Sequence, residues 1–196
     1  MDIPKVKTAT EAQQKAVTAT VAMAFSSDPF LRWILPDAAQ YLDVFPDFLK
    51  VIGGAASLRD GATFITEANE GASIWLKPGV HGEEAEIQKW VAEHVREEIL
   101  PDLVQIGQKN DAYRAECEPC WYLSFLAVDP NHQRKGIGSI QLKHVLKMLD
   151  EQAIPAYLES SNSENVSLYE RHGFEVMDEV QFGSSPIIRP MYRAPA

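Results

Sequence analysis

Residues 121–149, WYLSFLAVDPNHQRKGIGSIQLKHVLKML, hold the pattern that decides the fold. The first eight, Trp121–Val128, favour β-structure and are nearly continuous in apolar residues, which is typical of an interior strand. The strand is expected to stop at Asp129-Pro130-Asn131, and a turn with two glycines follows. Beyond the turn, apolar residues recur at the spacing of an amphipathic helix: Leu142, Val145, Leu146 and Leu149. The sequence therefore predicts a strand, a glycine turn and a helix in direct succession.

The turn Gln133-Arg134-Lys135-Gly136-Ile137-Gly138-Ser139 has the properties of an anion-binding loop. Gly136 and Gly138 let the backbone approach a ligand with no Cβ in the way. The amides that open the next helix have no acceptor inside it, so they can bind phosphate oxygens. Residues 131–149 include four Lys or Arg and no acid, although the chain carries a net charge of −10. No Lys-Ser/Thr pair follows Gly138 and position 141 is glutamine, which excludes a P-loop and a Rossmann fingerprint.

The residues before this segment predict helices and a hairpin. Apolar periodicity indicates helices over residues 8–25, about 41–56 and 83–99, and the last should end or kink at Pro101. Two β-favouring runs, 63–66 and 72–77, flank turn residues at 69–71 and predict a hairpin.

The residues after it predict further alternation. A strand is expected over Ala156–Ser160, a short helix over 163–172 closed by Gly173, and closing strands over 174–177 and 187–192. Strand, helix and strand in close succession imply a right-handed crossover between parallel neighbours. We therefore expect an α/β fold with a mixed sheet.

Composition limits the class of protein. The chain has 196 residues, 45% hydrophobic and 23% charged, which suits one globular domain. The net charge argues against nucleic acid as a partner, and no apolar run is long enough for a membrane span. The first five residues lack the features of a signal peptide, so a cytoplasmic location is expected. Cys117 and Cys120 lack a second ligand pair, so no metal site is expected.

Two motifs resemble those of the GNAT superfamily of N-acetyltransferases. Gln133, Gly136 and Gly138 match its Gln/Arg-x-x-Gly-x-Gly/Ala turn, and residues 157–174 match its second signature. Within the superfamily, residues 121–123 and 155–159 are similar to puromycin N-acetyltransferase-like proteins. The resemblance implies a mostly antiparallel mixed sheet flanked by helices, with one parallel strand pair splayed at the coenzyme A site. It also implies a single N-acetyltransferase domain over 1–196, with a variable acceptor half (1–110) and a CoA-binding half (121–193).

The resemblance further implies which residues hold acetyl-CoA, the co-substrate. The end of the first strand would pair with the pantetheine arm, the turn amides would hold the pyrophosphate, and an asparagine would contact the pantetheine. The cofactor-binding residues are then Leu126, Ala127, Val128, Gln133, Arg134, Lys135, Gly136, Ile137, Gly138, Ser139 and Asn165.

Two residues are candidates for catalysis. Tyr169 lies four positions after Asn165, and its phenol can protonate the departing CoA thiolate. Glu159 shares a strand face with Tyr157 and Ser161, where it either accepts a proton through water or only bonds neighbouring backbone. Many family members carry a base on the preceding strand, but this chain has no Asp or Glu from position 121 to 128, so the base stays unassigned.

The expected activity is acetyl transfer from acetyl-CoA to a primary amine of a small molecule, by direct attack in a ternary complex. Neither cysteine lies in the matched motifs, so no acyl-enzyme is expected. Two alternatives remain open: a peptide or protein N-terminus as acceptor, and a non-catalytic acyl-CoA-binding sensor. No nucleic-acid or membrane partner is expected.

Overall fold

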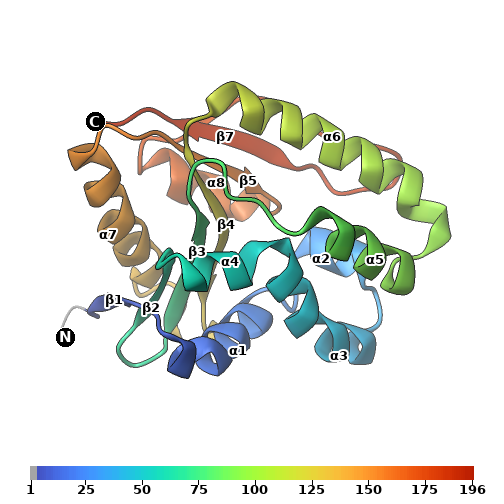
Figure 1. Cartoon of the computed structure of the whole chain (residues 1–196), viewed down its shortest axis with the longest axis horizontal. Helices are drawn as coiled ribbons and strands as arrows, with labels where there is room; N and C mark the ends of the chain where they lie inside the picture. The colour runs from blue at the N-terminus through green and yellow to red at the C-terminus, as the bar shows by residue number, and fades with distance from the viewer. Residues whose placement is uncertain (1–3) are drawn as a thin grey trace.

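The computed structural model describes residues 4–196, which form an α/β fold around one seven-stranded sheet (Figure 1). The strand order is β1-β2-β3-β4-β5-β7-β6, and every neighbouring pair is antiparallel except β4 and β5. The strands are β1 Val6–Thr8, β2 Thr63–Thr66, β3 Gly71–Leu76, β4 Trp121–Val128, β5 Ala156–Ser160, β6 Glu175–Val176 and β7 Arg189–Arg193. This arrangement confirms the predicted mixed, mostly antiparallel sheet with one parallel pair.

The parallel pair separates halfway along β4. Pairing with β5 covers only Trp121, Tyr122 and Leu123, whereas pairing with β3 continues to Val128. At the same place the register to β3 shifts, because Ile74 pairs with Phe125 and Trp75 with Leu123. Ser124 is therefore an extra residue on β4, a bulge of the kind that bends a strand and redirects its side chains. The bulge and the open edge of β4 leave room between β4 and β5.

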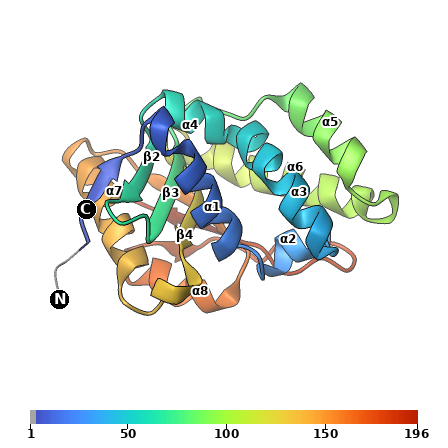
Figure 2. The same cartoon turned by 90° about the horizontal axis from the view of Figure 1, so that it is seen from below.

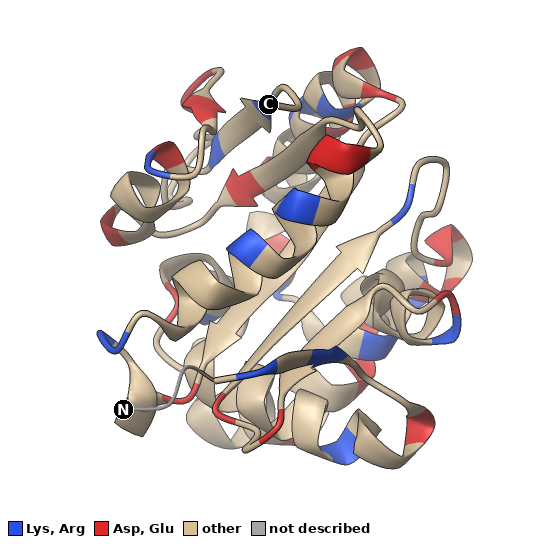
Figure 3. Cartoon of the chain, turned by 90° about the vertical axis from the view of Figure 1, so that its left-hand side faces the viewer, with Lys and Arg blue, Asp and Glu red and all other residues tan. Residues whose placement is uncertain are grey.

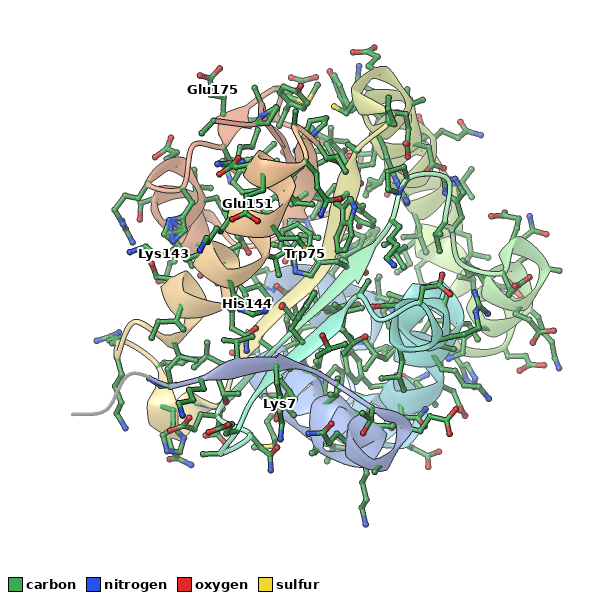
Figure 4. All side chains as sticks on the ribbon, turned by 60° about the vertical axis from the view of Figure 1, so that its left-hand side comes forward. Lys7, Trp75, Lys143, His144, Glu151 and Glu175 are labelled. Atoms are coloured by element: carbon green, nitrogen blue, oxygen red, sulfur yellow. The ribbon has the colours of Figure 1, made fainter. Side chains whose placement is uncertain are left out.

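Helices cover both faces of the sheet. They are α1 Gln14–Ala24, α2 Pro29–Ile34, α3 Ala38–Leu49, α4 Ala55–Arg59, α5 Glu84–His94, α6 Leu100–Cys117, α7 Ile137–Glu151 and α8 Ser163–Glu170. Helices α1 and α3 pack in one core with Ile74 and Phe125, and α1 crosses β3 and β4 in Figure 2. Helices α7 and α8 pack in a second core with Trp75 and Leu123 on the other face. Figure 4 shows Trp75 on the sheet beside α7.

The predicted helix over 83–99 is wrong at its C-terminal end. Helix α5 stops at His94, a short 3-10 turn Glu97–Ile99 follows, and α6 begins at Leu100. Pro101 lies in the first turn of α6, where the missing N–H leaves no hydrogen bond unmade. It therefore helps to start an eighteen-residue helix that the sequence analysis did not predict.

Two other predicted helices have different limits. Thr8 belongs to β1, and the α-helix begins only at Gln14, after a 3-10 turn over Glu11–Gln13. The helix predicted over 41–56 is broken into α3, a π-helical segment Lys50–Gly54 and α4. Gly53 has a φ of 122°, which interrupts the regular helix.

The hairpin and the C-terminal elements agree with prediction in type. Within residues 4–196, no helix combines the length and the apolar character needed to cross a membrane.

Candidate active site

A groove of about 560 Å³ lies where β4 and β5 separate. Its walls come from the end of β4, the glycine turn with the start of α7, and α8. The lining residues include Leu126, Val128, Gln133, Arg134, Gly136, Ile137, Gly138, Ser139, Asn165, Leu168, Tyr169 and Arg171. The structure thus brings together nine of the predicted cofactor-binding residues and one predicted catalytic residue.

The remaining two predicted cofactor-binding residues do not line this groove. Ala127 is fully buried, and its side chain packs in the core on the α1 face. Lys135 is exposed, and its ammonium group donates to the carbonyl of Asn131 at 2.9 Å. Lys143 and Lys147 are exposed and also lie outside the groove; Figure 4 shows Lys143 on α7, and Figure 3 shows basic positions along the same helix.

The glycine turn presents backbone amides to the groove. Gly136 is the N-terminal cap of α7 in the left-handed conformation, with a φ of 81°, and a Cβ on it would meet no atom within 4 Å. The first intrahelical bond joins the Ile140 amide to the Gly136 carbonyl, so the amides before Ile140 point away from the helix. Together with Arg134 and Arg171, this helix start favours an anion such as a phosphate.

Ser139, which lines the groove, contacts His172 outside the groove lining. The Ser139 hydroxyl and His172 Nε2 are 2.7 Å apart. Burial, followed by the charges of Lys143, Arg171 and Arg193, lowers the pKa of His172. The imidazole is therefore neutral at neutral pH and adds no charge to the groove.

A second hollow, of about 140 Å³, adjoins the groove. It lies between β4, β5 and the segments around α2, α3 and α6. Five residues line both hollows, so the hollows meet at them: Phe25, Asp28, Leu126, Asn165 and Tyr169. We call the second hollow the acceptor cavity.

Tyr169 lies at this junction. It belongs to α8, is 8% exposed, and packs edge-on against Phe174 with ring centroids 6.0 Å apart. Burial, followed by the charge of Asp28, raises the pKa of its phenol. The phenol is therefore protonated at neutral pH, as a proton donor must be.

Glu159 lies in the acceptor cavity and not in the groove. Its carboxylate accepts hydrogen bonds from Tyr157 (3.2 Å) and Tyr122 (3.3 Å), so the predicted shared face of Tyr157 and Glu159 is confirmed. The guanidinium of Arg114 lies 4.4 Å over the Tyr122 ring. Burial raises the pKa of Glu159 to about 7, although both tyrosines and the charge of Arg114 act in the opposite direction.

Asp28 lines both hollows, and the sequence reasoning did not identify it as a site residue. It caps α2, and its Oδ1 accepts from the amides of Phe30 and Leu31 at 3.0 and 2.9 Å. Its Oδ2 accepts from the Ser161 hydroxyl at 2.5 Å, which turns Ser161 toward Asp28. Asp followed by Pro29 is a recognisable helix start, but nothing local indicates that Ser161 lies beside it.

The cysteines lie apart from both hollows. Cys117 and Cys120 are buried free thiols in a cluster with Tyr157. Burial raises their pKa values to about 11 and about 12. Among residues 4–196, no three His, Cys, Asp or Glu side chains are grouped as metal ligands.

Comparison with known proteins agrees with this geometry. The sequence model of the acetyltransferase (GNAT) family matches residues 99–174. An uncharacterized N-acetyltransferase of Schizosaccharomyces pombe is 25% identical over 175 residues, or 82% of this chain and 70% of the relative.

Solved structures share the fold along the whole chain. One is a Corynebacterium glutamicum protein described as "histone acetyltransferase HPA2 and related acetyltransferase". It is 22% identical to this chain with a TM-score of 0.67, and the match covers 98% of this chain and 97% of that one. Arylalkylamine N-acetyltransferase 2 of Aedes aegypti is 11% identical with a TM-score of 0.69, covering 100% of both chains.

The fold is therefore that of the GNAT-type acyltransferases. Residues 99–174 match the acetyltransferase (GNAT) family, whose acetyl donor is acetyl-CoA, and the similar protein of Schizosaccharomyces pombe is an N-acetyltransferase.

Proposed function

We propose that the protein transfers the acetyl group of acetyl-CoA to a primary amine of a small molecule, by direct attack in a ternary complex. The observation that carries this proposal is the junction of the two hollows at Tyr169. One hollow has an anion-binding turn, and the other is a small cavity with carboxylates. A proton donor lies between them.

The groove fits the donor substrate. Pyrophosphate oxygens would bind the amides from Arg134 to Ser139, where Gly136 leaves the approach open. The pantetheine arm would lie along the free edge of β4 at Leu126 and Val128, as an added strand does, and would contact Asn165. Ala127 would take part only through its backbone, and Lys135 only as a nearby charge.

The proton transfers can be assigned to this chain's own residues. The acceptor, bound as an ammonium, must lose a proton before its nitrogen can attack the thioester carbonyl. Glu159, with a pKa of about 7, is in the right cavity to accept that proton, directly or through water. After the new C–N bond forms, the nitrogen passes its second proton to water, and Tyr169 donates its own proton to the thiolate as the C–S bond breaks. Glu159 later releases its proton to solvent. The tyrosinate then regains a proton from solvent.

A single domain over 1–196 would divide this work, with 1–110 supplying acceptor contacts and 121–193 holding the donor. Both halves contribute strands to one sheet, and both line the acceptor cavity. The cysteines are excluded from the transfer because they are buried in another cluster and keep their protons.

The acceptor class can be tested by following release of the CoA thiol with a panel of small primary amines and a panel of peptides with free N-termini. We expect amine-dependent release with small molecules, as the likeness to puromycin N-acetyltransferase-like proteins also suggests. Release with peptides alone would identify a peptide N-acetyltransferase. Tight acetyl-CoA binding without release by either panel would identify a sensor.

A further inference from the structure

Asp28 is a buried carboxylate with no cationic partner. It is 8% exposed, and among residues 4–196 it forms no ion pair. Three hydrogen bonds hold it, two from the amides of α2 and one from Ser161. A carboxylate removed from water is stable only when hydrogen bonds or a counter-charge replace its hydration. Burial raises the pKa of Asp28 despite these three hydrogen bonds, so they compensate its charge only in part, and a bound cation would add a counter-charge.

The position of Asp28 indicates where that cation would lie. Asp28 is one of the five residues that line both hollows, and its charge contributes to the raised pKa of the Tyr169 phenol. Its Oδ2 accepts from one donor only, Ser161, and so keeps a free lone pair. A positively charged group bound there would lie beside the proton donor.

Glu159, the other carboxylate of the cavity, is already compensated. Two phenols donate to it, and the Arg114 guanidinium stacks on one of them. Asp28 is therefore the carboxylate of this cavity that is left for a ligand.

The walls of the cavity describe the rest of the ligand. Beside the two carboxylates, the lining is dominated by apolar side chains, among them Phe25, Phe30, Leu31, Phe48, Ile52 and Phe125. Such walls favour an apolar body and disfavour a second charge.

We propose that Asp28 binds the ammonium group of the acceptor, and that the acceptor is a primary amine carried on an apolar, preferably aromatic, body. This proposal rests on the proposed acetyl transfer, but the binding of the ammonium group to Asp28 can be tested without measuring the transfer.

The test compares phenethylamine with phenethyl alcohol, which has a similar shape but no positive charge. Binding of both to the full chain is measured by calorimetry, with and without coenzyme A, for the wild type and Asp28→Asn. Asparagine also caps helices, so α2 should keep its N-terminal hydrogen bonds. We expect amine affinity to fall by about 30-fold or more and alcohol affinity to stay unchanged.

A matched control is Asp37→Asn, since Asp37 caps α3 by accepting from the Gln40 amide and does not line the cavity. It should leave both affinities unchanged. If Asp28→Asn does not fold, Asp28→Ser, another capping residue, takes its place.

Three results would overturn the proposal: no amine binding by the wild type, unchanged amine affinity in the variant, or an equal loss for amine and alcohol. Failure of the proposed function would look different. The wild type would then bind the amine through Asp28 but release no CoA thiol.

Discussion

Glu159 permits a test of the acceptor cavity that needs no ligand. Its carboxyl group lies between the phenols of Tyr122 and Tyr157, and burial raises its pKa from 4.5 to about 7. The substitution Glu159→Gln keeps the size of the side chain and one acceptor oxygen, but removes the ionisation. The variant should therefore lose one component of the pH dependence of stability.

The sign and size of that component follow from the pKa values. A carboxyl group with a higher pKa in the folded than in the unfolded chain stabilises the fold only while it is protonated. The stabilisation is complete below 4.5 and is lost as the pH rises through about 7. This difference corresponds to about 3 kcal/mol, and partial exposure of the side chain reduces it to roughly 2 kcal/mol.

The assay is urea unfolding of both proteins at about pH 5 and about pH 8. Between these values the free energy of unfolding of the wild type should fall by roughly 2 kcal/mol relative to Glu159→Gln. His144 and His172, whose pKa values are lowered by burial, are present in both proteins, so their contribution cancels. Glu164→Gln, an exposed change on α8, should behave like the wild type. Equal pH dependence in wild type and Glu159→Gln would refute the buried, protonatable carboxyl.

Two further substitutions test the glycine turn and a buried ion pair. Gly136→Asp should abolish coenzyme A binding, because it places a carboxylate against the phosphates. Calorimetry measures this loss. Gly79→Asp is the control and should leave coenzyme A binding unchanged, although Gly79 has a similar φ of 72° and equally open surroundings. Normal coenzyme A affinity in Gly136→Asp would mean that the glycine turn does not bind the phosphates. Asp150→Asn should lower the free energy of unfolding by about 3 kcal/mol, because it leaves the guanidinium of Arg193 buried without its bidentate partner. A loss below about 1 kcal/mol in urea unfolding would show that the pair contributes little.

The parts of the fold that the sequence predicted are those governed by local chemistry. The glycine turn, the strand before it and the helix after it follow from residues that are neighbours in the chain. Gly136 does adopt the left-handed conformation that favours glycine, and α7 starts at Ile137. The rule for strand-helix-strand crossovers predicts β4 and β5 as parallel neighbours, and the structure has them so.

The parts that it missed depend on contacts between distant residues. Helix α6 has weak amphipathic patterning, and Pro101 at its start predicts from sequence an end or a kink of the preceding helix. The bulge at Ser124 appears only in the pairing with β3. Asp28 and Ser161 are 133 positions apart, so no spacing in the sequence shows that they meet.

For the same physical reason, the donor side is easier to predict from sequence than the acceptor side. Backbone amides at a helix start bind phosphate whatever the neighbouring side chains are. The acceptor cavity instead is lined by residues from α2, α3, α6, β4 and β5, and its chemical character depends on how these elements pack together.

The most direct test of the central claim is to measure turnover and coenzyme A binding together in the wild type and Tyr169→Phe. The substitution removes only the phenolic oxygen at the junction of the two hollows. We expect coenzyme A affinity to stay unchanged, while amine-dependent release of CoA thiol falls by about 100-fold or more. Unchanged turnover in Tyr169→Phe would contradict the claim, because the group assigned to protonate the departing thiolate would then be dispensable.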